Sequence, residues 1–153
     1  EAARGGKDGS KLPLQGTRGY QYSLKEFAPD LLQDAAILYI WVTPEESRRK
    51  NFARANPNDP GSNLFHGVPS TVRRNEYGAD DREYLRKSSE VKNTITIISQ
   101  GKKFHLPIGV FDNRIDRTSF LRQDSKDWEK SEVDAVTKSI KEATDIRWKN
   151  YNK

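Results

Sequence analysis

The feature that most constrains the fold is a continuous apolar run, Ala35–Val42, that leads directly into a charged segment. The run has no alternation of apolar and polar residues, which is typical of a strand buried on both faces of a sheet. Thr43 and Pro44 suit the N-cap and the first position of a helix. Glu45 and Glu46 follow, where the positive end of the helix dipole favours acidic side chains. The sequence therefore predicts a buried strand over 36–42 that turns at once into a helix.

The predicted helix is rich in positive charge. Its basic residues are Arg48, Arg49, Lys50 and Arg54. Arg49 and Lys50 each follow a glutamate by four residues, a spacing at which an ion pair stabilises a helix by roughly 0.2–0.5 kcal/mol. Arg48 and Arg54 have no partner at that spacing, so they are the sharper candidates for contact with an anion such as phosphate. The alternative is an ordinary solvated helix face.

The rest of the chain divides into short elements separated by turn signals. Loops are predicted over 1–19 and 56–70, short helices over 23–32, 70–78 and 80–90, strands over 94–99 and 103–111, and a final helix over 127–148. Ser23 is the expected cap of the first helix, and Pro29 limits that helix to a short or broken form. Pro107 argues that the last strand lies at an edge, or that this residue is near the strand start.

These elements predict an α/β fold with a mainly parallel sheet flanked by helices. Residues 1–123 form the predicted core, with a charged, lid-like excursion over 48–90, and residues 124–153 form a C-terminal helix. Val133, Val136, Ile140 and Ala143 make the apolar stripe of that helix. Arg73, Arg74, Arg82 and Arg86 extend the positive region of the excursion and are expected to be exposed to solvent.

Composition limits the possible partners. The chain has 153 residues, of which 33% are hydrophobic and 32% charged, and its net charge of +5 suits an anionic partner such as a nucleotide, a nucleic acid or an acidic protein face. It has no cysteine, so disulfides and thiolate metal sites are excluded. His66 and His105 lack metal-ligand spacing, and we predict no metal site built from side chains. The longest apolar run is too short to span a bilayer and no signal pattern is present, so we expect a cytoplasmic protein with no membrane contact.

The order of strand, basic helix, charged excursion, strand, loop and final helix resembles the C-terminal half of a P-loop kinase of the nucleotide-kinase type. "ILYIWV" resembles the strand that leads into an arginine-rich lid, and "LPIGVFDN" resembles the last strand, which ends beside the adenine. "EAARGG" resembles the residues just after the second acidic strand, which face the substrate phosphate and magnesium. The resemblance covers most of residues 1–123.

This resemblance implies ATP-dependent phosphoryl transfer or NTP hydrolysis, with ATP and Mg²⁺ as cofactors and a phosphoryl acceptor of unknown identity. It implies that Arg48, Arg49 and Arg54 act as lid arginines that stabilise the transferring phosphoryl group. Glu1 and Arg4 would face magnesium and substrate. Phe111, Asp112 and Asn113 would border the base, at the strand end where ligands bind on open α/β sheets.

The phosphate-binding signature G-x-x-x-x-G-K-[ST] occurs nowhere in the chain, and there is no methionine, even at position 1. We therefore expect that an N-terminal half with the phosphate loop lies outside these 153 residues. The alternative function is a basic module that binds nucleic acid or supports assembly without catalysis. A third possibility is an NTPase-like fold that has lost its chemistry and serves only as an interaction domain.

Overall fold

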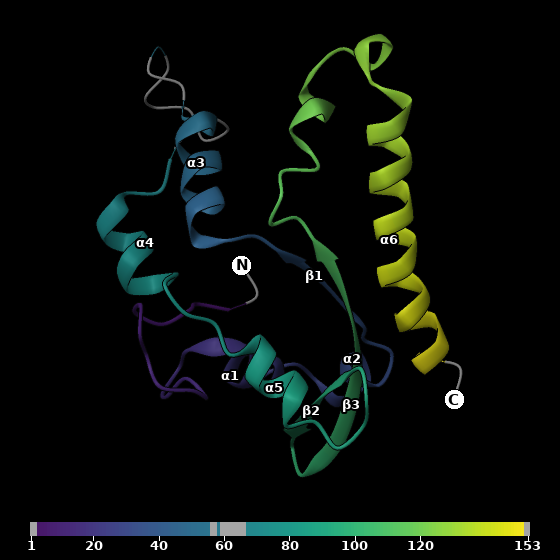
Figure 1. The fold of residues 1–153 in the computed structure, drawn as a ribbon. Coiled ribbons are helices and arrows are strands. Elements are labelled where there is room, and N and C mark those ends of the chain that lie inside the picture. The colour runs from purple at the N-terminus through teal and green to yellow at the C-terminus, as the bar shows by residue number, and fades with distance from the viewer. Residues whose placement is uncertain (1–2, 56–57, 59–66, 152–153) are drawn as a thin grey trace.

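The computed structural model describes residues 3–55, 58 and 67–151 (Figure 1). Its helices are α1 (Gly19–Lys25), α2 (Pro29–Gln33), α3 (Pro44–Arg54), α4 (Ser70–Glu76), α5 (Arg82–Lys87) and α6 (Lys130–Tyr151). Its strands are β1 (Ile37–Trp41), β2 (Thr94–Ser99) and β3 (Lys102–Asp112), and two 3-10 turns cover Ser119–Arg122 and Ser125–Asp127. The predicted α/β class is confirmed. No helix in the described part of the chain is both long and apolar enough to cross a membrane.

The sheet is mixed, so the prediction of a mainly parallel sheet is wrong. Its strand order is β1-β3-β2, with β1 parallel to β3 and β2 antiparallel to β3. The cause is the short link between β2 and β3, in which Gln100 and Gly101 have φ values of 48° and 76°. A two-residue turn of this kind joins neighbouring antiparallel strands, whereas a parallel pair needs a crossover of a dozen or more residues.

Pro107 lies in the middle of the central strand β3, neither at an edge nor near the strand start as predicted. The two neighbours of β3 meet at this residue. Strand β2 pairs with residues 102–107, and β1 pairs with residues 108–112. Because the β1 ladder begins only at Ile108, the missing N–H of Pro107 falls outside it.

Helices cover the two faces of the sheet unequally. The main core joins Leu24, Leu32 and Leu85 of α1, α2 and α5 to Ile95, Ile97, Leu106 and Ile108 of the sheet. The long helix α6 packs against β3 on the other face, where a Cβ at Gly109 would overlap the backbone carbonyl of Ala143 (Figure 1). Val136 and Ala143 of its predicted stripe are buried, while Ile140 is 41% exposed.

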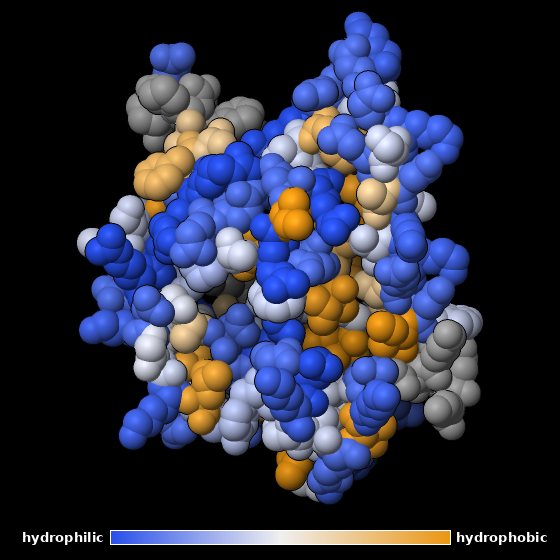
Figure 2. Space-filling model, viewed as in Figure 1, coloured by the Kyte–Doolittle hydropathy of each residue, from blue (hydrophilic) through white to orange (hydrophobic). Residues whose placement is uncertain are grey.

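Strand β1 is an edge strand, which corrects the prediction that both of its faces are buried. Among the strands of the described residues it pairs with β3 alone, and Leu38 and Ile40 remain 39% and 57% exposed. Apolar side chains gather between the sheet and α6 in Figure 2. In the described residues, the continuous apolar run Ala35–Val42 therefore does not form a strand with both faces buried.

The first helix begins earlier than predicted and has a different cap. Helix α1 starts at Gly19, and Ser23 lies inside it. The carboxylate of Asp81, which is 0% exposed, accepts hydrogen bonds from the backbone N–H groups of Tyr20 at 2.7 Å and Gln21 at 3.2 Å. The predicted break is confirmed, since Pro29 opens the separate helix α2. The cap is thus provided by a residue 61 positions further along the chain than Tyr20.

We expect Gly19→Ala to destabilise the protein more than Gly9→Ala. Both glycines have positive φ, 83° and 77°, so alanine at either position costs roughly 1–2 kcal/mol. A Cβ at Gly19 would also overlap the Asp81 carboxylate, whereas nothing lies within 4 Å of a Cβ at Gly9. Urea unfolding of both variants measures the difference in free energy. Equal losses would show that the close approach of Asp81 is unimportant.

Candidate anion-binding site

Helix α3 begins as its sequence predicts. The hydroxyl of Thr43 accepts a hydrogen bond from the backbone N–H of Glu46 at 3.1 Å, and Pro44 occupies the first helical position. This local start places the basic residues of α3 directly beyond the carboxyl end of β1.

Two arginines of α3 pair with glutamates three residues earlier, not four as predicted. Arg48, not Arg49, pairs with Glu45, at 2.9 Å. Arg49 instead pairs with Glu46 at 2.6 Å, and the predicted pair of Lys50 with Glu46 is confirmed at 3.7 Å. Residues three apart also share a helix face, so this exchange keeps the charges paired. Arg48 therefore has a partner that the i,i+4 rule did not reveal.

Asp116, in the loop after β3, binds the other side of α3. Its carboxylate pairs with Lys50 at 3.1 Å and with Arg49. Burial alone would raise the pKa of Asp116, but hydrogen bonds from Ser119 and Lys50 outweigh it and hold that pKa well below the usual range. Arg49 and Lys50 are thus neutralised, and they tie α3 to the loop.

Three other guanidinium groups gather between α3 and α4 and form what we call the arginine cluster: Arg48, Arg54 and Arg73. Among the described residues, no carboxylate lies within ion-pair distance of Arg54 or Arg73. Arg73 Nη2 donates to the Ser47 hydroxyl at 2.6 Å, and its buried Nε has no hydrogen-bond partner in the described part of the chain. Burial lowers the pKa of Arg73, and the positive charges of Arg48 and Arg54 lower it further. The cluster is a place where an anion would relieve repulsion.

The sequence did not single out Arg73 as a candidate site residue. It was expected to be exposed to solvent, whereas it is partly buried against α3. Arg82, for which the same expectation was made, is only 5% exposed. The sequence holds no local signal for the burial of either residue, because Arg73 reaches Ser47 in α3 and Arg82 lies over two rings of β1. Arg82 also pairs with its neighbour Glu83.

Arg82 lies in an aromatic cluster at the carboxyl end of β1. Its guanidinium lies 4.3 Å from the ring centre of Tyr39 and 5.1 Å from that of Trp41. Burial raises the pKa of Tyr39 above its usual range, and the Asp80 carboxylate, which accepts from the Tyr39 hydroxyl at 2.8 Å, adds to the rise. These contacts hold α5 against the sheet and use Arg82 structurally.

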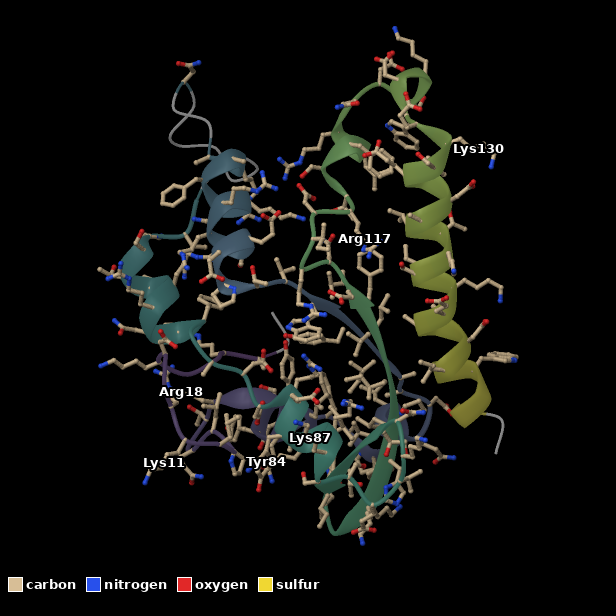
Figure 3. All side chains as sticks on the ribbon, viewed as in Figure 1. Lys11, Arg18, Tyr84, Lys87, Arg117 and Lys130 are labelled. Carbon is tan, nitrogen blue, oxygen red and sulfur yellow. The ribbon has the colours of Figure 1, made fainter. Side chains whose placement is uncertain are left out.

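The predicted residues at the end of β3 lie together, but they serve the turn that follows. Phe111 is only 3% exposed. A hydrogen bond from Arg114 lowers the pKa of Asp112 to about 2. The Asn113 side chain accepts from the Arg117 backbone N–H at 2.8 Å (Arg117 is labelled in Figure 3). A role of Phe111, Asp112 and Asn113 beside a base stays a prediction.

Arg4 is not brought into the arginine cluster. Glu1 lies outside the described residues. Arg4 pairs at 3.8 Å with Glu76, at the end of α4, and Arg18 shares that carboxylate at 3.2 Å (Figure 3). Their contacts fasten the N-terminal segment to α4.

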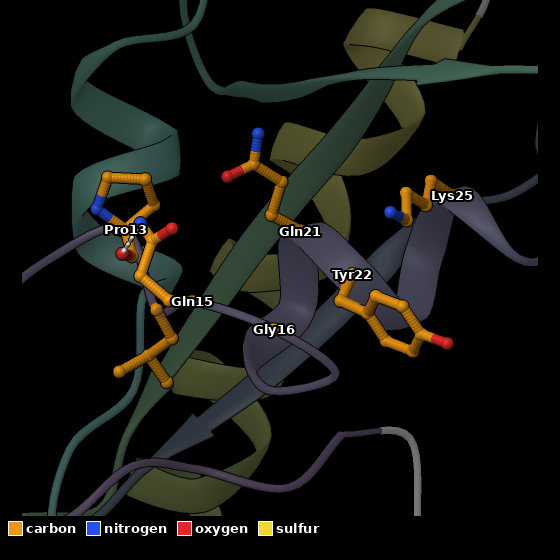
Figure 4. A pocket seen from close by; sticks show the side chains of 7 residues that line it. Pro13, Gln15, Gly16, Gln21, Tyr22 and Lys25 are labelled. Atoms are coloured by element: carbon orange, nitrogen blue, oxygen red, sulfur yellow. Dashed lines mark hydrogen bonds between the residues drawn. The ribbon is translucent and has the colours of Figure 1, made fainter.

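A shallow pocket lies beside α1 (Figure 4). It is lined by Pro13, Leu14, Gln15, Gly16, Gln21, Tyr22 and Lys25. None of the predicted site residues borders it, so it is separate from the arginine cluster. Among the residues that the structure describes, no group of three or more histidine, cysteine, aspartate or glutamate side chains is arranged to hold a metal ion.

Comparisons of the chain with protein-family models, with curated proteins and with solved structures found no match. The interpretation of the site therefore rests on its geometry and charge.

The ion pair of Asp112 with Arg114 predicts a loss of stability in acid. Because the pKa of Asp112 is about 2 in the folded protein and about 3.9 in an unfolded chain, its ionised form stabilises the fold above about pH 4. That contribution is lost as the pH falls towards 2. Urea unfolding between pH 5 and pH 2.5 should show a flatter pH dependence for Asp112→Asn than for the wild type.

The matched control for this measurement is Asp30→Asn, which removes an exposed carboxylate that forms no ion pair among the described residues. Its pH dependence should follow the wild type. An unchanged slope for Asp112→Asn would contradict the role given to Arg114.

Proposed function

We propose that this protein binds the phosphates of a nucleotide through the arginine cluster and takes part in ATP-dependent phosphoryl transfer or NTP hydrolysis. The observation that carries the proposal is the gathering of Arg48, Arg54 and Arg73, for which the described residues supply one carboxylate, Glu45. Like charges placed this closely favour a bound anion. Phosphate suits such a cluster, because each planar guanidinium can donate two parallel hydrogen bonds to the phosphate oxygens.

Arg48 and Arg73 can each contact a ligand at a modest cost in free energy. Arg48 is 49% exposed, and its pair with Glu45 is a surface ion pair of the kind that contributes little to stability, so a phosphate can replace the glutamate. Arg73 is held by the neutral hydroxyl of Ser47 rather than by a carboxylate. In phosphoryl transfer, such arginines position the phosphates and stabilise the charge that develops on the equatorial oxygens.

In this proposal, a magnesium ion bound with the nucleotide would be held mainly by phosphate oxygens and water, as is usual for Mg²⁺ in such sites. The phosphate-binding loop is assigned to a segment outside these 153 residues. Strand β1 supports that assignment, since it lies at the edge of the sheet in the described part of the chain, where the backbone of a further strand can pair. The phosphoryl acceptor stays open.

A second candidate function is non-specific binding of nucleic acid. One observation favours it: the loop after β3, which Asp116 holds against α3, carries two arginines that form no ion pair among the described residues. These residues are Arg117 and Arg122, whereas Arg114 is paired with Asp112. Binding of this kind weakens by roughly 0.9 log units per phosphate contact per tenfold rise in salt on duplex DNA. Competition by nucleotide and a weak salt dependence would instead favour the nucleotide site.

We expect Arg73→Ala to weaken binding of inorganic pyrophosphate by roughly 10- to 100-fold, because a hydrogen bond to a charged group contributes about 1.5–3 kcal/mol. Calorimetry at fixed salt measures the affinity. The control is Arg74→Ala, which removes the same charge from an exposed neighbour in α4. Equal weakening in the two variants, or no binding by the wild type, would overturn the proposed site.

A further inference from the structure

Asn51 lies at the centre of the α3 face that carries the arginine cluster. It follows Arg48 by three residues and precedes Arg54 by three, so the three side chains share one side of the helix. Asn51 is only 4% exposed, although asparagine is usually found at the surface. A buried amide in a helix interior has to find partners for its oxygen and its nitrogen.

Both partners of the Asn51 amide belong to one residue, Val68. The amide oxygen accepts from the Val68 backbone N–H at 2.8 Å, and the amide nitrogen donates to the Val68 carbonyl at 3.0 Å. The preceding Gly67 packs closely, since a Cβ there would lie 3.3 Å from Asn51 Nδ2. Asn51 thus fixes the backbone at residue 68 to α3 in both position and orientation.

This fixed point controls where Arg73 lies. Val68 is followed by Pro69, whose carbonyl accepts the hydrogen bond of the Arg73 backbone N–H at 3.1 Å. The start of α4 therefore links Val68 rigidly to Arg73, and the Arg73 guanidinium returns to α3 at Ser47. Helix α4 itself spans only Ser70–Glu76 and buries none of its residues, so little apolar packing holds it in place.

We propose that Asn51 is the positioning residue of the anion site: by pairing with Val68 it places Arg73 opposite Arg48 and Arg54. This inference rests on the proposed function for its ligand. Asn51 contacts Arg54 at 3.5 Å through the same oxygen, so it orients both unpaired arginines without offering them a charge. An aspartate at this position would reduce the positive charge of the cluster, and an alanine would leave Val68 without its side-chain partner.

A double-mutant cycle tests this link. Asn51→Ala should weaken pyrophosphate binding by roughly tenfold or more, close to the effect of Arg73→Ala. If Asn51 acts through Arg73, then adding Arg73→Ala to Asn51→Ala should weaken binding less than about twofold further, because the two changes remove the same contact. Additive losses, or unchanged affinity of Asn51→Ala, would overturn the inference.

A readout without ligand separates this inference from the proposed function. In the wild type, the buried Nε–H of Arg73 should give a protected side-chain NMR signal, which Asn51→Ala abolishes and the control Asn75→Ala in α4 retains. If the wild type binds no pyrophosphate but this pattern holds, the function fails and the positioning role stands. If Asn51→Ala keeps the signal, the positioning role fails. If Asn51→Ala does not fold, Asn51→Gln replaces it, because glutamine shifts the amide by one methylene. Loss of the Arg73 Nε–H signal in Asn51→Gln supports the positioning role, and its retention contradicts that role.

Discussion

The buried carboxylate of Asp81 is the interaction on which the arrangement of the fold depends. It accepts hydrogen bonds from two backbone N–H groups at the start of α1, where the helix dipole is positive. A fully buried carboxylate is costly unless such donors surround it, so the carboxylate and the helix end stabilise each other. Gly19 permits this approach, because any larger residue would overlap Asp81. The first helix and the start of α5 are therefore held together.

The neighbours of Asp81 extend this junction to the sheet. Asp80 accepts a hydrogen bond from the Tyr39 hydroxyl, and Arg82 lies over the rings of Tyr39 and Trp41. Three successive residues thus bind α1, β1 and α5. Together with the ion pairs of Asp116 with Arg49 and Lys50, they attach the excursion over 48–90 to the core. The arginine cluster is consequently supported from α3 and from α4, so a bound anion would meet side chains that are already in place, which would reduce the entropy lost on binding.

The sequence was informative where the physics is local. The start of α3 follows from Thr43 and Pro44, and the break before α2 follows from Pro29, because caps and proline act within one helical turn. It failed where the deciding partner is distant. Asp81 caps a helix 61 residues earlier, and Arg73 reaches Ser47 over 26 residues. The sheet as a whole was wrongly predicted to be mainly parallel, although the short link at Gln100 and Gly101 is of hairpin length and indicates an antiparallel pair.

The same contrast explains why charge count alone is a poor guide to the site. Helix α3 offers four basic residues, yet Glu46 and Asp116 neutralise Arg49 and Lys50 and give them a structural task. Arg54 and Arg73 lack a carboxylate among the described residues, and Arg73 is also partly removed from water. Charges that are shielded from solvent interact more strongly with a ligand than exposed ones. An anion should therefore be attracted to the α3–α4 side of the helix rather than to the side bound by Asp116, even though both sides carry arginine.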